Sequence, residues 1–221
     1  MSLAVVLVSG GLDSAVTLAV AQRDGHDCIA VTFDYGQRHR VELACAARVV
    51  AAAGVMEHRT VIIDASALAG SALTGGGAVP HGRSDAVIGE GIPATYVPAR
   101  NLVFLSLALA IAETAGARAL YIGANAVDYS GYPDCRGVFL ESFERTANLA
   151  TKAGVEGEAF VVHAPLLDLP KADIIGLGHD LGVDFELTSS CYDPEPDGTA
   201  CGTCDSCIIR AAGFAAASVG G

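Results

Sequence analysis

A short polar segment interrupts the otherwise apolar N-terminal region and contains Ser9, Gly10, Gly11, Asp13 and Ser14. Glycine lets the backbone turn sharply and lets a ligand come close, because it carries no Cβ atom. The free N–H groups of such a turn, and of a helix that begins after it, attract anions, and the serine hydroxyl groups can donate further hydrogen bonds. These residue types in this order predict a loop that binds phosphate.

Asp13 is the residue of this segment that would repel a phosphate group. A carboxylate at the start of a helix can act as a cap, and this structural role stays open. A divalent cation between the carboxylate and a polyphosphate would remove the repulsion, so the sequence predicts Mg²⁺ near Asp13. The sequence has no G-x-x-x-x-G-K-[ST] segment, and chemistry at the γ-phosphate is therefore not indicated.

Two cations stand at predicted helix starts. Arg100 precedes an apolar helical stretch, and Lys171 follows Pro170, which suits the first turn of a helix. A cation at the positive end of a helix is unfavourable unless an anion lies nearby. Lys171 is one of only two lysines, so we expect both side chains to contact phosphate, with solvated side chains as the alternative. Four residues after the second predicted strand are also expected near the nucleotide: Asp34, Tyr35, Gln37 and Arg38.

Four cysteines with the spacing C-x9-C-x2-C-x2-C lie near the C-terminus: Cys191, Cys201, Cys204 and Cys207. Two thiolates in a C-x2-C pair can converge on one metal ion, and Gly202 permits the tight turn between them. The set predicts a tetrahedral zinc site, with an iron–sulfur cluster as the chemical alternative. Because four protein ligands leave zinc no open position, we expect the metal ion to be structural.

The pattern of apolar residues indicates the scaffold that must position these groups. Short apolar runs, typical of strands, alternate with longer stretches of helical spacing. Strands that are apolar throughout have helices on both faces, so we predict an α/β fold with a doubly wound, mainly parallel sheet that binds ligands at the carboxyl ends of its strands. The predicted strands are 3–8, 28–33, 59–64, 119–124 and 159–165, and the predicted helices are 14–23, 38–53, 101–115, 138–153 and 171–181.

The chain divides into a large and a small part. We expect a nucleotide-binding α/β domain over residues 1–187, and a zinc-binding segment with a C-terminal helix over residues 188–221. Residues 66–95 are rich in glycine, proline and serine and have no clear period, which is typical of a long functional loop. We predict a flexible flap beside the site, and a surface insertion without a role is an equal alternative.

Composition excludes several classes of partner. The formal net charge is −12, so the chain lacks the basic balance expected of a protein that binds nucleic acid or acidic membranes directly. No apolar run reaches the length of about 20 residues that a bilayer requires, and the N-terminus lacks a charged region before its apolar run. We therefore expect a cytoplasmic protein. The apolar stretch 101–115 and the apolar C-terminus would suit a homodimer.

The S-G-G-x-D-S segment after the first predicted strand resembles the PP-loop of the ATP pyrophosphatases, and the similarity to one family runs almost end to end. The segments that carry it are LVSGGLDSAV, DYGQRHRVEL, YVPARNLVFLSLALAIAE, GANAVDYSGYPDCR, APLLDLPKADII and TSSCYDPEPDGTACGTCDSCIIRAAGF. Together they resemble the 7-cyano-7-deazaguanine synthase (QueC) family of queuosine biosynthesis.

The resemblance implies a reaction. The family converts 7-carboxy-7-deazaguanine and ammonia to the nitrile with two ATP molecules, through an adenylated acid and an adenylated amide, and releases AMP and pyrophosphate. It implies catalytic roles for Asp13, Arg100 and Lys171. It also implies nucleotide-binding residues and substrate-binding residues. The first set is Val8, Ser9, Gly10, Gly11, Leu12, Asp13, Ser14, Ala15 and Val16, and the second set is Asp128, Ser130, Asp134 and Arg136.

Two other functions remain open at this point. One is a PP-loop enzyme that adenylates and modifies tRNA, which would be expected to carry a basic RNA-binding extension. The other is a nucleotide-sensing module that binds ATP without turnover and uses its metal segment to contact a partner. The acidic net charge argues against the first.

Overall fold

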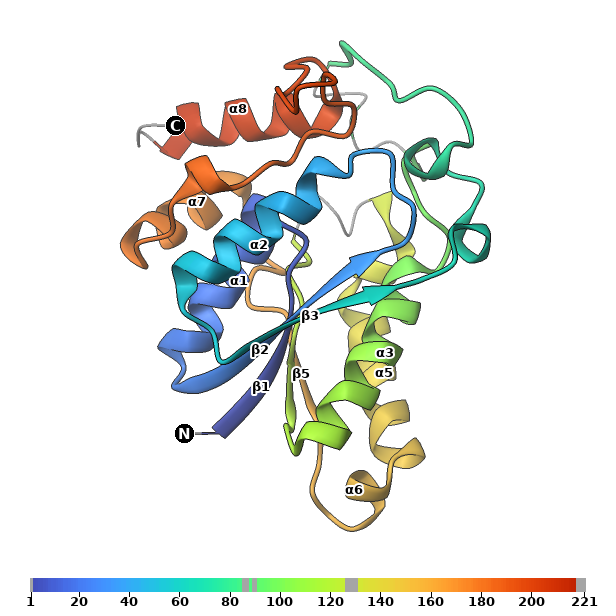
Figure 1. The fold of residues 1–221 in the computed structure, drawn as a ribbon, viewed down its shortest axis with the longest axis vertical. Coiled ribbons are helices and arrows are strands. Elements are labelled where there is room, and N and C mark those ends of the chain that lie inside the picture. The colour runs from blue at the N-terminus through green and yellow to red at the C-terminus, as the bar shows by residue number, and fades with distance from the viewer. Residues whose placement is uncertain (1, 85–87, 89–90, 126–130, 218–221) are drawn as a thin grey trace.

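A computed structural model describes residues 2–84, 88, 91–125 and 131–217 (Figure 1). Its centre is one sheet of five parallel strands in the order β3-β2-β1-β4-β5. The strands are β1 (Ser2–Leu7), β2 (His26–Asp34), β3 (Glu57–Ile62), β4 (Ala119–Tyr121) and β5 (Val161–His163). The predicted fold class, a doubly wound parallel α/β sheet, is confirmed.

Helices follow the strands in the alternation that the sequence predicts. They are α1 (Leu12–Arg23), α2 (Val41–Ala53), α3 (Arg100–Ala115), α5 (Gly137–Ala150), α6 (Lys152–Val155), α7 (Lys171–Asp180) and α8 (Asp205–Ala217). Within the described residues, no helix combines the length and the apolar character that crossing a bilayer requires.

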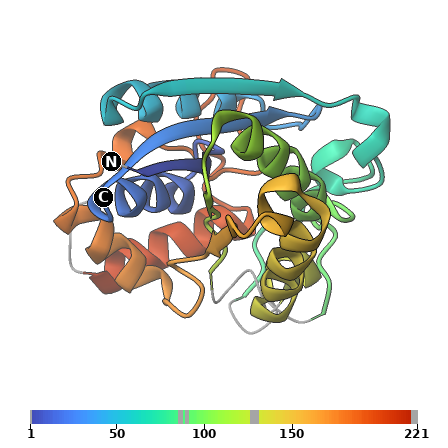
Figure 2. The same cartoon turned by 90° about the horizontal axis from the view of Figure 1, so that it is seen from below.

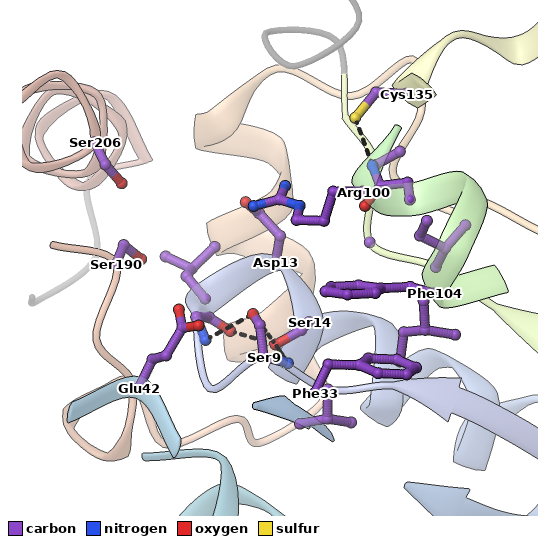
Figure 3. Close-up of a pocket in the computed structure, with 18 of the residues that line it drawn as sticks. Ser9, Asp13, Ser14, Phe33, Glu42, Arg100, Phe104, Cys135, Ser190 and Ser206 are labelled. Carbon is purple, nitrogen blue, oxygen red and sulfur yellow. Dashed lines mark hydrogen bonds between the residues drawn. The ribbon is translucent and has the colours of Figure 1, made fainter. Parts of the chain in front are cut away.

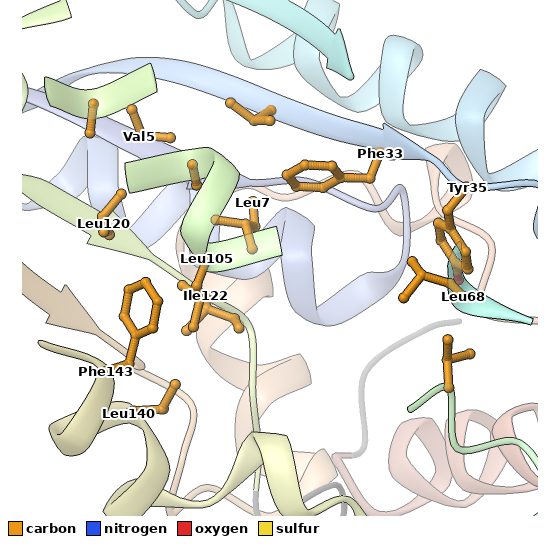
Figure 4. Close-up of a cluster of buried hydrophobic side chains, with 14 of the residues drawn as sticks. Val5, Leu7, Phe33, Tyr35, Leu68, Leu105, Leu120, Ile122, Leu140 and Phe143 are labelled. Atoms are coloured by element: carbon orange, nitrogen blue, oxygen red, sulfur yellow. The ribbon is translucent and has the colours of Figure 1, made fainter. Parts of the chain in front are cut away.

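The two faces of β1 bury different side chains, because successive residues of a strand point to opposite sides. Val5 and Leu7 belong to a cluster with the inner faces of α3 and α5, whereas Ala4 and Val6 belong to a cluster with α1, α2 and α7. Figure 4 shows the first cluster, and Figure 2 shows α3 and α5 gathered apart from α1, α7 and α8. The buried strands therefore carry helices on both faces.

One predicted helix differs from the structure. The stretch 138–153 is two helices, α5 and α6, which are separated at Thr151. Thr151 has an extended backbone, and its side chain accepts a hydrogen bond from the N–H of Gly154, so it caps α6 rather than continuing α5. The other predicted elements are present with ends shifted by up to three residues.

The strand order fixes where a ligand can bind. From β1 the chain builds outward through β2 and β3 on one side, and later through β4 and β5 on the other. The segments that leave the carboxyl ends of β1 and β4 therefore diverge at this point, and such a switch point opens a crevice. The polar segment Ser9–Ser14 leaves β1 at this position.

Candidate functional site

The Ser9–Ser14 loop is held by its own side chains (Figure 3). The Ser14 hydroxyl donates to the carbonyl oxygen of Gly11 at 2.9 Å and lies 3.2 Å from the Ser9 hydroxyl. The N–H group of Gly11 donates to the Ser9 hydroxyl at 3.2 Å. The loop thus stands as a preformed turn between β1 and α1, and α1 begins at Leu12 with its first N–H groups directed toward the crevice.

Gly10 is required by its surroundings. Its φ of +91° lies in the region that favours glycine, and a Cβ atom there would lie 2.2 Å from the backbone oxygen of Glu42 and 2.6 Å from the backbone nitrogen of Ala46. The backbone of α2 therefore packs directly against the loop. The N–H of Ser189 donates to the Gly10 carbonyl at 3.0 Å, so the C-terminal part of the chain also supports the turn.

Asp13 and Lys171 form an ion pair in the crevice. The Lys171 ammonium donates to both carboxylate oxygens, at 2.7 and 2.8 Å, and Asn125 from the segment after β4 donates to Oδ2 at 3.2 Å. The Lys171 side chain is 14% exposed, so the pair is largely withdrawn from water. The anion expected near Lys171 is, in this structure, the carboxylate of Asp13.

Arg100 is the first residue of α3 and faces the same cavity. Its guanidinium lies 3.5 Å from the Tyr35 hydroxyl, which accepts a hydrogen bond from it. Burial raises the pKa of the Tyr35 phenol, and the nearby guanidinium partly offsets this effect. Of the four residues expected near the nucleotide after the second strand, Tyr35 lines the cavity. Asp34 instead pairs with Arg40, Arg38 lies 3.5 Å from Asp193, and Gln37 is buried beneath the loop.

Arg210 is a third cation at the cavity and was not singled out from the sequence. Its guanidinium donates to the Thr188 hydroxyl at 2.9 Å and to the Phe185 carbonyl at 3.0 Å. Burial lowers the pKa of Arg210, and the negative charge of Asp13 acts in the opposite direction. Arg210 reaches this place because α8 packs closely on α7 at Gly213, where a Cβ atom would lie 2.5 Å from the Lys171 side chain.

The cavity has a volume of about 220 Å³ and joins a polar end to an apolar end. The polar end holds the loop, Lys171 and Arg210, and Arg100 lies beside the aromatic rings, because it donates to Tyr35. At the apolar end the rings of Phe33 and Phe104 stack at 4.1 Å (Figure 3). Tyr35 meets Phe104 edge-on at 5.3 Å. An apolar aromatic wall beside a cluster of cations suits a ligand with a planar ring and a phosphate or carboxylate group.

His39 and Glu42 also line the cavity, and sequence reasoning did not single them out. His39 Nε2 lies 3.0 Å from one carboxylate oxygen of Glu42, and the Gln37 amide donates to the other at 2.9 Å. Gln37 is itself fixed, because its amide also donates to the Phe33 carbonyl and its oxygen accepts the N–H of Tyr35. The hints in the sequence were the position of these residues beyond the carboxyl end of a strand and their place in the DYGQRHRVEL segment.

Two of the four residues predicted to bind substrate, Asp134 and Arg136, lie within the described residues. Asp134 is buried, and its carboxylate accepts the N–H of Asn101 at 2.8 Å, near the start of α3. Arg136 is exposed and donates to the Pro133 carbonyl. Asp128 and Ser130 lie outside the described residues. The segment 131–136 reaches the cavity through Tyr132 and Cys135. Roles in substrate binding for the four predicted residues stay predictions.

The four C-terminal cysteines converge. Their sulfur atoms lie within 4.8 Å of one another, and Cys201 Sγ lies 4.0 Å from Cys207 Sγ. Tetrahedral Zn–S bonds of about 2.3 Å would place sulfur atoms about 3.8 Å apart, so this donor set fits one metal ion. Burial raises the pKa of the Cys201 thiol, but hydrogen bonds from the N–H groups of Thr203 and Cys204 and with the thiols of Cys191 and Cys204 together lower it to about 6. Such N–H groups stabilise the thiolate form that binds metal.

Residues 81–83 tie the long insertion to the cysteine segment. His81 forms a β-bridge with Cys204 and a hydrogen bond with Thr203 at 2.9 Å, and Arg83 pairs with Asp205. Just before the cysteine segment, the N–H of Ser189 donates to Gly10 in the Ser9–Ser14 loop. Helix α8 carries both Cys207 and Arg210. The chain segments that carry the cysteines therefore also support the Ser9–Ser14 loop and position Arg210 at the cavity.

Comparisons with known proteins show the family of the chain. The family model "Queuosine biosynthesis protein QueC" matches residues 3–218. A protein of Ectopseudomonas mendocina named 7-cyano-7-deazaguanine synthase is 59% identical over 98% of this chain and 95% of its own, and one of Paramagnetospirillum magneticum with the same name is 57% identical over 99% and 96%. The structure of NMN synthetase from Francisella tularensis is 21% identical, covers 91% of this chain and 69% of its own, and has a TM-score of 0.49. Since the family model and these relatives span almost the whole sequence, the chain belongs to the QueC family of queuosine biosynthesis proteins.

Proposed function

We propose that this protein converts 7-carboxy-7-deazaguanine and ammonia to 7-cyano-7-deazaguanine with two ATP molecules, as an ATP-dependent carbon–nitrogen ligase that releases AMP and pyrophosphate. The observation that carries the proposal is the Ser9–Ser14 loop facing three cations, Lys171, Arg100 and Arg210, across one cavity. The relatives are named for the product, 7-cyano-7-deazaguanine, which supports the proposed product of this chain.

The cations fit a reaction that expels pyrophosphate. A carboxylate oxygen of the substrate attacks the α-phosphorus of ATP, and the bond to the β-phosphate oxygen breaks. Negative charge then grows on the leaving pyrophosphate, which N–H groups of the loop and the side chains of Lys171 and Arg100 would stabilise. Lys171 would exchange the Asp13 carboxylate for a phosphate oxygen in this step.

Nitrogen enters after the first adenylation. Ammonia attacks the acyl-adenylate carbon, the bond to AMP breaks, and a proton leaves the nitrogen to give the amide. The amide oxygen then attacks a second ATP, pyrophosphate leaves again, and loss of AMP and of both nitrogen protons gives the nitrile. The stacked rings of Phe33 and Phe104 offer an apolar wall for a planar heterocycle during these steps.

Two metal ions belong to the proposal. Asp13 would hold Mg²⁺, which would screen the charge of the triphosphate. Cys191, Cys201, Cys204 and Cys207 would hold Zn²⁺ as a structural ion that fixes the C-terminal segment beside the cavity. Substrate contacts of Asp128, Ser130, Asp134 and Arg136, the absence of a direct nucleic-acid partner, a homodimer and a cytoplasmic location stay predictions from the sequence.

The test is to incubate the protein with the acid, an ammonium salt, Mg²⁺ and ATP and to follow products by mass spectrometry. We expect the nitrile, with two AMP and two pyrophosphate formed for each nitrile. Formation of ADP and orthophosphate would contradict the proposed bond cleavage. Adenylate formed on tRNA, and not on the free acid, would favour a tRNA-modifying enzyme instead.

A further inference from the structure

Glu42 is a carboxylate at the cavity that the reaction above does not use. Its side chain is 15% exposed and stands next to the phosphate loop (Figure 3). His39 and Gln37 each hold one of its oxygens, at 3.0 and 2.9 Å. Each carboxylate oxygen can accept two hydrogen bonds, so the group keeps capacity for a further donor.

Glu42 differs from the other carboxylate at the cavity in its ion pairs. The described lining residues include two carboxylates, Asp13 and Glu42, and Asp13 is already paired with Lys171. Glu42 has no ion pair with a lysine or arginine among the described residues. Besides Lys171 and His39, the other ionisable groups that line the cavity are Arg100, Arg210, Tyr35, Tyr132, Tyr192 and Cys135.

His39 provides a place for a proton. Its ring is 5% exposed and lines the cavity, and Nδ1 is buried with no hydrogen-bond partner among the described residues. Since Nε2 faces the Glu42 carboxylate, a neutral ring carries its hydrogen there and leaves a lone pair on Nδ1. A buried nitrogen without a partner is unfavourable, so an incoming N–H donor would gain a hydrogen bond.

The proposed reaction needs such a pair, because ammonia is mostly ammonium at neutral pH and ammonium has no lone pair with which to attack carbon. An ammonium ion would also be repelled by Lys171, Arg100 and Arg210. A carboxylate on the same cavity, free of those cations, would attract it. The adjacent His39 ring can then accept its proton through the lone pair on Nδ1.

We propose that Glu42 binds ammonium at this cavity and that the His39–Glu42 pair takes its proton, releasing ammonia beside the acyl-adenylate. One N–H bond of ammonium breaks, the proton stays on the pair, and the nitrogen lone pair forms the C–N bond as the bond to AMP breaks. Because Nδ1 is enclosed, Glu42 makes the first contact, and the ring or its neighbour Tyr192 must shift before Nδ1 accepts the proton. The inference rests on the proposed function.

The test compares ammonium with hydroxylamine, a nitrogen nucleophile that is uncharged at neutral pH. In Glu42→Gln we expect the KM for ammonium to rise about tenfold or more, as lost charge-assisted binding would give. Two other rates should stay within about twofold of the wild type. One is the exchange of labelled pyrophosphate into ATP that depends on 7-carboxy-7-deazaguanine, and the other is turnover with hydroxylamine. His39→Gln should lower kcat with ammonium more than it raises KM, and Glu42→Asp should restore the KM.

The control is Glu141→Gln, which removes an exposed carboxylate of α5 outside the cavity and should change none of these values. Equal losses with ammonium and hydroxylamine, or an unchanged KM for ammonium, would overturn the inference. Loss of pyrophosphate exchange in Glu42→Gln would also overturn it, since the carboxylate would then be supporting the phosphate loop. If the wild type itself shows no acid-dependent exchange, the proposed function fails instead.

Discussion

Lys171 and Asp13 are 158 positions apart in the chain, yet the Lys171 ammonium donates to both oxygens of the Asp13 carboxylate. The pair joins the first turn of α1 to the first turn of α7, next to the loop that we assign to phosphate. Each partner neutralises the other's charge where little water reaches them. A nucleotide with Mg²⁺ would supply new partners for both, so the same two side chains can serve the free and the bound state.

The first prediction concerns Lys171. In Lys171→Met we expect the exchange of pyrophosphate into ATP in the presence of 7-carboxy-7-deazaguanine to fall about 10²-fold to 10³-fold. The reason is that a cation that stabilises the leaving group is lost. Thermal unfolding should show a folded protein. Lys152→Met is the matched control, since Lys152 is the other lysine and its side chain is 79% exposed. Equal activity of the two variants would show that Lys171 has no role beyond its pair with Asp13.

The second prediction concerns Gly10. In Gly10→Ala the new Cβ would collide with the backbone of α2, so we expect a loss of about 3 kcal/mol or more in the free energy of unfolding and loss of ATP binding. Gly25→Ala is the control, because Gly25 has a similar φ of +89° but open space around its Cβ position. That variant should lose about 1 kcal/mol and keep ATP binding by calorimetry. Similar losses in both would mean that φ alone, not the packing of α2, demands glycine.

Local features of the sequence predicted the strands, most helices and the turn at Ser9–Ser14, and phosphate binding by this turn stays a prediction. A strand, a glycine turn and a helix are set by residues within a few positions of one another, and the apolar pattern settles which faces are buried. The break at Thr151 was missed because the apolar spacing continues through it. A threonine that turns its hydroxyl toward a following N–H ends one helix and starts the next without changing that spacing.

Parts of the site that depend on tertiary packing could not be predicted. Arg210 reaches the cavity because Gly213 lets α8 approach Lys171, and the local sequence around these residues does not show that α8 packs there. The same holds for His39 and Glu42, whose pairing depends on how Gln37 folds back under the loop. The cysteine set was predictable, because its close spacing limits the ways in which three of the four thiols can be arranged.

The third prediction concerns the cysteine cluster. The purified protein should contain about one metal ion per chain, and Cys201→Ser should lose it, because three thiolates and a hydroxyl bind zinc more weakly. Metal content by mass spectrometry and the midpoint of thermal unfolding should fall together. Cys28→Ala is the control, since this buried thiol lies in β2, outside the cluster, and should leave the metal content unchanged. Visible absorption with bound iron would indicate an iron–sulfur cluster instead of zinc.

The fourth prediction concerns pH and the ring of His163, the last residue of β5. The ring of His163 stacks on Tyr121 at 4.5 Å; burial lowers the pKa of His163, and the charge of His26 acts in the same direction. A histidine whose pKa is lower in the folded state binds a proton more readily when unfolded, so it favours folding above its ordinary pKa and opposes it below. We therefore expect the free energy of unfolding to fall between about pH 7.5 and about pH 5.5, and to fall less in His163→Gln.

Denaturant titrations at both pH values measure this slope of unfolding free energy against pH. His179→Gln, at an exposed position of α7, should keep the wild-type slope, and the same slope in all three proteins would contradict the assignment of this acid sensitivity to the His163 ring.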